Sequence, residues 1–430
     1  NFNHIFFSQI ILILDSDNKI KKKIIDNDLE IFKKKKYWST SKRVVYPSST
    51  IKYYIKLTYN SILKWIAYRH NIFFNLNIPL GYISKQLISK LGDIFFISFD
   101  DLSPKNIDIS QEWERKIFSE YPNKNEDEFE KIVLNLINIF LPKEYYENFE
   151  YNYNYYSKKI PKKIPKIVGL RSPNEFKTEL RFISSILKEK GSKILACQEG
   201  GDGGARALSE INEKINSQMC DFFLTWGWKS KNNNFIPFYF TKLFWIKKYD
   251  YNNNGKILLI QGTYRKYFLS MQVGQIPFYN DIQLEMTKLF IGNLSKQAYN
   301  KSTLRFHTQF GYNEKEKIKK NFNNIDISTR EKEPNFYKLF YNSRLLIVFV
   351  DFTTFKQSFI LNHPTILIWD KEYFINRVEA QKYYDILHKA GILYYSAEEC
   401  AKHVNAIFEN PYKWWFSNEV QKAKKHFMSN

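Results

Sequence analysis

The chain has 430 residues, a length that exceeds one ordinary hydrophobic core and predicts two domains. Apolar residues make up 44% of it and aromatic residues 18%, which predicts a globular protein and argues against disorder. The net charge of +21 predicts an anionic partner: phosphate groups, nucleic acid or an anionic membrane surface.

The cysteine pattern argues against an exported, disulfide-bonded protein. Cys197, Cys220 and Cys400 are an odd number without paired spacing, which favours a reducing compartment, the cytoplasm. No run approaches the about 18 uninterrupted apolar residues of a spanning helix. The chain begins at Asn1 rather than at a methionine, so truncation at this end stays open.

The chain up to residue 156 gives few clear patterns, apart from a helix expected at residues 126–140. After it, strands and helices alternate in a βαβ arrangement. The expected elements are strand 164–169, helix 174–190, strand 193–197, a glycine-dense loop at 198–204, helix 205–218 and strand 221–226.

The alternation continues to the C-terminal region and predicts a mostly parallel sheet with helices on both faces. Strands are expected at 256–261, 303–307, 344–350, 365–369 and 392–395, and helices at 281–291, 354–362, 377–390 and 397–408. We place the domain boundary near residue 230, which gives domains of residues 1–230 and 231–430.

Two loops stand where open α/β sheets bind ligands, after the carboxyl ends of strands. In the first, glycines allow close backbone approach and two carboxylates lie among them; it comprises Gln198, Glu199, Gly200, Gly201, Asp202, Gly203 and Gly204. The spacing G-x-G-x-x-G is absent, so a dinucleotide fingerprint is not supported. A tight turn into the next helix is the alternative interpretation.

The second loop, residues 351–354, follows an apolar strand and precedes a helix. Its hydroxyls, Thr353 and Thr354, either cap that helix or bind a diphosphate beside its N–H groups. Arg265, Lys266 and Arg305 lie at or after strands of the same domain and could join them.

Other catalytic patterns are missing. Cys400 and His403 lack the companion pair that a zinc site needs, so we expect no metal and no cofactor. Neither G-x-S-x-G nor G-x-x-x-x-G-K-S/T occurs, which counts against a serine hydrolase and a P-loop NTPase.

Several segments carry a family resemblance that spans roughly residue 160 to the C-terminus. They are residues 176–204, Asp221 through Thr225-Trp226-Gly227-Trp228, 351–369, and 391–427 with Trp414-Trp415. This pattern resembles the transferases of spirochaete O-antigen loci, relatives of capsule-type glycosyltransferases with the GT-B fold. The resemblance implies an α/β fold with two Rossmann-like domains facing a central cleft. It places the acceptor on the N-terminal domain and a nucleotide-sugar donor on the C-terminal one.

The resemblance also implies site residues. The loop with Gln198, Gly200, Gly201 and Gly203 would face the cleft, and Thr353 and Thr354 would meet the donor phosphates. This chain departs from the family pattern in two places. It has Glu199 where the family has histidine, and Gln357 where an acidic residue binds the donor ribose. An amide still bonds a hydroxyl, without the charge-assisted strength of a carboxylate.

The sequence thus predicts a glycosyltransferase that acts on an O-antigen or capsule-type acceptor. Glu199 or Asp202 is the expected base, and Arg265, Lys266, Arg305, Thr353, Thr354 and Gln357 the expected donor-binding residues. Peripheral contact with the anionic inner face of the membrane fits the charge. Two alternatives stay open: a non-catalytic relative with the same fold, and a nucleic-acid-binding protein, suggested by lysines interleaved with tyrosines in residues 151–166.

Overall fold

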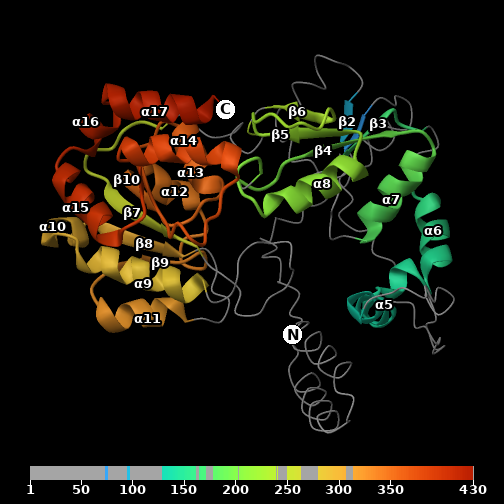
Figure 1. Ribbon diagram of the computed structural model, residues 1–430, viewed down its shortest axis with the longest axis horizontal. Helices are drawn as coiled ribbons and strands as arrows, with labels where there is room; N and C mark the ends of the chain where they lie inside the picture. Colours follow the sequence, from blue (N-terminus) through green and yellow to red (C-terminus); the bar gives the residue numbers. More distant parts are fainter. Residues whose placement is uncertain are drawn as a thin grey trace, which may run out of the picture. The chain divides into compact units, whose positions relative to one another are not determined.

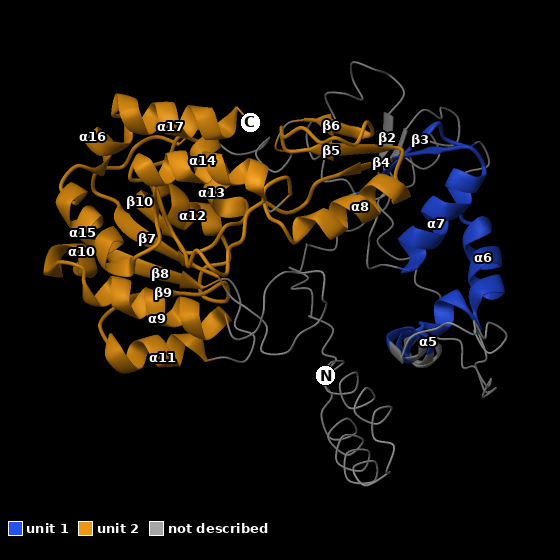
Figure 2. Cartoon of the chain, in the orientation of Figure 1, with its two compact units in different colours: residues 1–77, 86–170, 175–194 blue, residues 78–85, 171–174, 195–430 orange. Residues whose placement is uncertain are grey.

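The computed structural model describes residues 73–75, 94–96, 128–160, 164–170, 178–201, 203–238, 240, 249–262, 279–306 and 313–429. The chain divides into two compact units, shown in Figure 2. Unit 1 comprises residues 1–77, 86–170 and 175–194, and unit 2 comprises residues 78–85, 171–174 and 195–430. The domain boundary near residue 230 stays a prediction.

The described part of unit 1 contains three short strands and a group of helices. They are β1 (Phe73–Asn75), β2 (Ile94–Phe96), α5 (Glu128–Phe140), the 3-10 helix η1 (Lys143–Tyr145), α6 (Phe149–Ser157), β3 (Ile167–Leu170) and α7 (Thr178–Glu189). Strand β4 (Lys193–Cys197) contributes residues to both units. The described strands of this first sheet lie in the order β2-β1-β3-β4-β5-β6.

The other elements belong to unit 2 (Figure 1). They are α8 (Ser209–Met219), β5 (Phe222–Thr225), β6 (Phe235–Pro237), β7 (Lys256–Gln261), α9 (Tyr279–Gly292), α10 (Lys296–Asn300), β8 (Ser302–Phe306), α11 (Glu314–Asn321), β9 (Asp326–Ser328), α12 (Phe336–Tyr341), β10 (Ser343–Val348), α13 (Thr353–Ile360), β11 (Thr365–Ile368), α14 (Val378–Lys389), β12 (Leu393–Tyr394), α15 (Ala397–Ile407), α16 (Pro411–Trp415) and α17 (Asn418–Met428).

The second sheet has the order β12-β11-β10-β7-β8-β9, and its strand pairs are parallel. In chain order this is the 3-2-1-4-5-6 arrangement of nucleotide-binding Rossmann folds. The order reverses between β7 and β10, where Leu259 pairs with Ile347. Ligands of such sheets bind at the carboxyl ends of the two strands that flank this reversal.

Alternate residues of the central strands feed two separate cores. Leu258 and Leu346 pack with the helices that include α13, α14 and α17, whereas Leu259 and Ile347 pack with those that include α9, α11 and α15. In Figure 1, α14 and α17 cover one face of this sheet, and α9 and α11 cover the other. Both sheets are parallel with intervening helices, so the predicted α/β class is confirmed.

The predicted elements between residues 164 and 226, and between 256 and 408, are confirmed where the structure describes them, with one correction; residues 174–177 and 307 lie outside the described residues. The helix expected from residue 205 begins at Ser209. Residues 205–207 stay outside the helix because they pair with residues 375–377: the Arg377 N–H donates to the Ala205 carbonyl at 2.9 Å, and Arg206 forms an antiparallel bridge with Asn376. A partner far away in the chain therefore overrides the local helical pattern.

His363 links α13 to β11 from a fully buried position. Its ring nitrogens lie 2.9 Å from the Pro364 carbonyl oxygen and 3.1 Å from Ser343 Oγ. Burial lowers the pKa of His363 to about 4, because the imidazolium form would lose its hydration. The folded protein therefore holds this ring neutral at physiological pH.

We predict that His363 makes the protein less stable in acid. Its folded pKa is below its unfolded value, so its contribution is complete above about pH 6.5 and is lost as the pH falls toward 4. Between pH 7.5 and 5.0 the loss should be about 2 kcal/mol in the free energy of urea unfolding. His363→Gln should remove this part of the pH dependence. The exposed His388→Gln should keep it, and equal pH profiles in the wild type and His363→Gln would refute the prediction.

Candidate functional site

The glycine-dense loop is held by the side chain of Gln198, which is buried. Its Oε1 accepts hydrogen bonds from the Trp226 N–H at 2.8 Å and from Trp228 Nε1 at 2.7 Å. Its Nε2 donates to the Gly200 carbonyl at 2.6 Å. One amide therefore joins the glycine loop after β4 to the Trp-Gly-Trp segment after β5.

Two of the glycines lie close against neighbouring side chains. A Cβ on Gly204 would lie 2.5 Å from a ring carbon of Trp228, and Gly204 has a φ of +79°, which side chains rarely adopt. A Cβ on Gly203 would lie 2.9 Å from Nε2 of Gln198. The loop therefore packs flat against Gln198 and Trp228.

A third glycine brings the loop against the first turn of α13. A Cβ on Gly201 would lie 2.5 Å from the Thr353 backbone nitrogen and 2.6 Å from the Phe352 carbonyl carbon. The Lys356 ammonium donates a hydrogen bond to the Gly201 carbonyl. Within unit 2, the two loops that the sequence singled out are thus in direct contact.

An ion pair fastens the start of α8 to the start of α14 beside this contact. Arg377 Nη2 lies 2.7 Å from Glu213 Oε1, and both side chains are nearly buried. The same carboxylate accepts from the Gly204 N–H at 2.8 Å, and Arg377 Nε donates to the Arg206 carbonyl at 3.2 Å. Glu213 and Arg377 therefore hold the glycine loop next to the start of α14.

The first turn of α13 lies just beyond β10, one of the strands that flank the reversal in strand order. Phe352 occupies the cap position and makes no side-chain hydrogen bond, so Thr353 and Thr354 are the first two helical residues rather than caps. Both are half-buried. The N–H groups of a first turn have no intrahelical partner, and the helix dipole favours an anion there.

The other predicted site residues are placed in different surroundings. Glu199 is exposed at the start of the glycine loop. Arg305 is buried in β8, where its Nη1 donates to Ser328 Oγ at 2.8 Å and to the Thr329 carbonyl at 2.5 Å. Burial lowers the pKa of the Arg305 guanidinium. Asp202, Arg265 and Lys266 lie outside the described residues.

Gln357 is buried in α13, and its Nε2 lies 3.2 Å from the Tyr337 hydroxyl oxygen on α12. The Gln357 amide therefore donates a hydrogen bond to the Tyr337 hydroxyl. The role of Gln357 at a donor ribose stays a prediction, as do the roles of Glu199, Arg305, Thr353 and Thr354.

Sequence reasoning missed a buried carboxylate next to the same turn. Asp351 is fully buried directly before Phe352, and its Oδ2 accepts a hydrogen bond from the Tyr384 hydroxyl at 2.9 Å. Burial and, after it, the Asp351 carboxylate raise the pKa of Tyr384. An acidic residue at the end of an apolar strand was the available signal.

A buried network of amide side chains lies at the ends of β7 and β10. Thr287 Oγ1 donates to Gln261 Oε1 at 2.7 Å, and Gln283 Nε2 donates to the Phe349 carbonyl at 2.5 Å. Gln261 ends β7, and Phe349 follows β10. Polar groups from α9 therefore tie together the ends of the two strands that flank the reversal.

Strand order, glycine loop and helix N-terminus together define an α/β protein with a phosphate-compatible site in unit 2. The sequence matches the model of the LIC12162 family transferases over residues 1–430. The chain belongs to this family and is a transferase. Comparison with curated proteins found no match.

Comparison with solved structures returned several proteins of low identity. TarM is 13% identical with a TM-score of 0.38, and the match covers 64% of this chain and 54% of TarM. A Staphylococcus aureus TarM variant in complex with fondaparinux, α-GlcNAc-glycerol and UDP is 12% identical with a TM-score of 0.40, covering 65% and 55%. UDP-GlcNAc 2-epimerase from Neisseria meningitidis bound to UDP-GlcNAc is 13% identical with a TM-score of 0.40, covering 83% and 97%. The matched part of the chain spans about half the length of TarM.

We predict that Gly201→Ala separates the glycine loop from α13. The added methyl group meets backbone atoms that cannot rotate away, so the free energy of unfolding should fall by about 1–3 kcal/mol. Gly292→Ala is the matched control, because its Cβ would meet only Phe322 ring atoms at 3.7 Å or more. Urea unfolding of both variants checks this. If Gly201→Ala is as stable as Gly292→Ala, the close contact is wrong.

Proposed function

We propose that the protein is a glycosyltransferase that uses a nucleotide-sugar donor. The observation that carries this proposal is the first turn of α13, which stands beside the strand reversal and against Gly201. A nucleotide diphosphate suits such a place, since it would meet backbone N–H groups, the hydroxyls of Thr353 and Thr354, and the positive end of a helix dipole. Membership in a transferase family supports group transfer rather than hydrolysis or redox chemistry.

The reaction would join an acceptor oxygen to the anomeric carbon while the bond from that carbon to the diphosphate breaks. A base must take the acceptor proton, and donors must stabilise the negative charge that develops on the leaving diphosphate. We assign the base to Glu199 or Asp202, of which Glu199 is exposed to solvent. We assign Thr353, Thr354 and the first turn of α13 to the diphosphate. We propose that the reaction needs no metal.

We further propose a surface-polysaccharide acceptor of the O-antigen or capsule type, from the family resemblance of residues 160–430. We also propose a cytoplasmic location, from the odd number of cysteines without paired spacing. The non-catalytic alternative predicts that the donor binds without turnover. Glu199 and Gln357, which replace the expected histidine and acidic residue, motivate this alternative. Donor binding and donor consumption must therefore be measured separately.

We predict that one nucleotide among UDP, GDP, CMP and their sugar conjugates raises the melting temperature. A ligand at about 100 times its Kd stabilises the folded state by about 2.7 kcal/mol. Thr354→Val should reduce the shift, whereas Thr178→Val, at the first residue of α7 in unit 1, should keep it. The absence of a shift with every nucleotide would overturn the proposal. A shift without release of nucleotide from any conjugate, in the presence of acceptor glycans, would favour the non-catalytic alternative.

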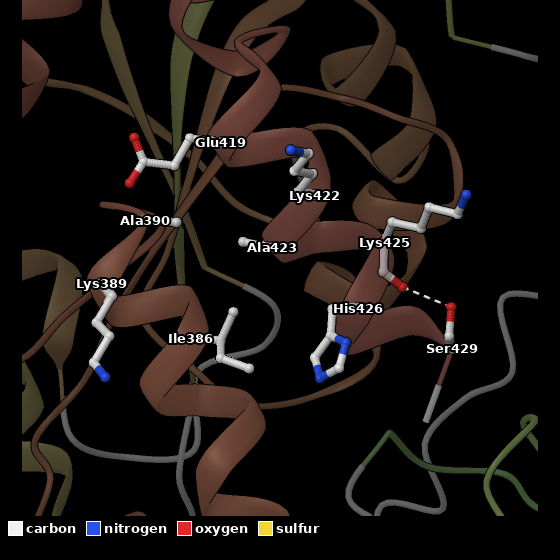
Figure 3. A pocket seen from close by; sticks show the side chains of 9 residues that line it. All are labelled: Ile386, Lys389, Ala390, Glu419, Lys422, Ala423, Lys425, His426 and Ser429. Atoms are coloured by element: carbon white, nitrogen blue, oxygen red, sulfur yellow. Dashed lines mark hydrogen bonds between the residues drawn. The ribbon is translucent and has the colours of Figure 1, made fainter.

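A basic groove between α14 and α17 supports our proposal that the protein contacts an anionic membrane surface. The groove has a volume of about 610 Å³. In Figure 3, Ile386 and Ala423 lie between Lys389 on one side and Lys422 and Lys425 on the other, and the carboxylate of Glu419 also lines the groove. All three lysines are exposed. Among the described residues, no helix is long and apolar enough to span a bilayer.

We predict that replacing Lys389, Lys422 and Lys425 together by glutamine weakens binding to vesicles that contain phosphatidylglycerol. Each lysine near an anionic surface contributes about 1 kcal/mol, so the loss should reach on the order of 100-fold in a sedimentation assay. The control changes Lys296, Lys301 and Lys320, which are exposed elsewhere in unit 2. Equal binding by both triple variants would remove this groove from the proposal.

A further inference from the structure

A groove between α6 and α7 in unit 1 is walled by aromatic rings. Phe149 and Tyr153 lie four residues apart on one face of α6, and Tyr145 of η1 precedes them; all three rings line the groove. Phe182, Arg181 and Glu189 of α7 line the other side. Of these residues, Tyr153 lies in the segment 151–166, whose interleaved lysines and tyrosines suggested a binding surface. The proposed donor site uses none of the groove residues.

The rings form a preorganised wall. Phe182 stacks on Tyr145 with ring centroids 5.9 Å apart and planes 9° apart, and it contacts Phe149 at 5.6 Å. Behind it lies Tyr156, which is 1% exposed and stacks on Phe182 at 5.5 Å. Phe149 nevertheless remains 49% exposed. A rigid aromatic group that is left half in water beside a groove is a feature of binding surfaces.

Hydrogen-bond donors and acceptors surround the rings. Arg181 Nη1 donates to the Tyr145 hydroxyl at 3.2 Å, and the Tyr153 hydroxyl lies 3.5 Å from Glu189 Oε2. Hydroxyl, guanidinium and carboxylate groups thus offer donors and acceptors at the rim of an apolar wall. This combination matches a ligand that has an apolar face and several hydroxyls.

The groove has room for a single ring. Its volume is about 170 Å³. A protein cavity of about 150 Å³ holds one benzene molecule, so one six-membered ring fits here.

We propose that this groove binds a pyranose ring of a glycan, with the C–H face of the sugar on Phe149 and Tyr145 and its hydroxyls on Arg181 and Glu189. The identification of that glycan as the acceptor rests on the proposed glycosyltransferase function; the affinity for sugar does not. A nucleic-acid base would also stack, but the described rim carries one cation, Arg181, against one carboxylate, Glu189, so it offers no net attraction for the adjoining phosphates. Among the described residues that line the groove, none is a lysine.

The experiment measures binding of glucose, galactose, mannose and N-acetylglucosamine trisaccharides to the full chain by saturation-transfer NMR and calorimetry, without any nucleotide. At least one trisaccharide should bind, and Phe149→Ala should weaken it on the order of tenfold, the effect of losing one stacking partner. Tyr151→Ala is the matched control, since Tyr151 is 48% exposed on the same helix but does not line the groove. Glu189→Lys, at an exposed position, gives a second variant that should also weaken sugar binding.

Three outcomes would overturn the proposal. They are no binding of any trisaccharide to the wild type, equal losses in Phe149→Ala and Tyr151→Ala, and tight binding of a thymidine oligonucleotide that Phe149→Ala abolishes and Glu189→Lys strengthens. The last outcome would assign the groove to single-stranded nucleic acid. Sugar binding in a protein that binds none of the nucleotides would contradict the glycosyltransferase proposal and leave the groove as a glycan site.

Discussion

The parallel pairing of β7 with β10 is the constraint on which the second sheet depends. These strands are distant in sequence, yet their register sends alternate side chains to opposite faces, Leu258 and Leu346 to one core and Leu259 and Ile347 to the other. Each face is then covered by its own set of helices. The same pairing creates the reversal in strand order and so fixes where a ligand can meet the carboxyl ends of two strands.

Close backbone contact assembles the candidate site at this reversal. Gly201 contacts the backbone of Thr353 so closely that a residue with a Cβ at position 201 would clash with it. The loop cannot drift away, because Gln198 fixes it to the Trp-Gly-Trp segment and Glu213 fixes it to Arg377. A nearly buried ion pair keeps its strength where an exposed pair would be weakened by solvent, provided that its other polar atoms are satisfied, and here the Gly204 N–H and the Arg206 carbonyl meet that need.

The surfaces that the proposals use differ in their physical character. The proposed donor site relies on backbone N–H groups and a helix dipole, which suit a diphosphate. The groove between α14 and α17 relies on exposed lysines, whose effect is long-ranged and depends on salt. The groove between α6 and α7 relies on aromatic faces with a mixed polar rim, which favour a neutral, hydroxyl-rich ring. We propose that these three surfaces bind the donor, the membrane and a glycan, respectively.

The sequence by itself determined the alternation of strands and helices from residue 164 onward, because buried strands and amphipathic helices are local patterns. It also located both loops of the candidate site, from glycine density and from hydroxyls after an apolar strand. Only the tertiary structure decided which groups meet. The pairing of residues 205–207 with 375–377 displaced the start of α8, and Arg305 donates hydrogen bonds to Ser328 and Thr329. Gln357 hydrogen-bonds to Tyr337, and Asp351 accepts a hydrogen bond from Tyr384. Such partners lie tens to more than a hundred residues away, and no local periodicity records which of them will be neighbours.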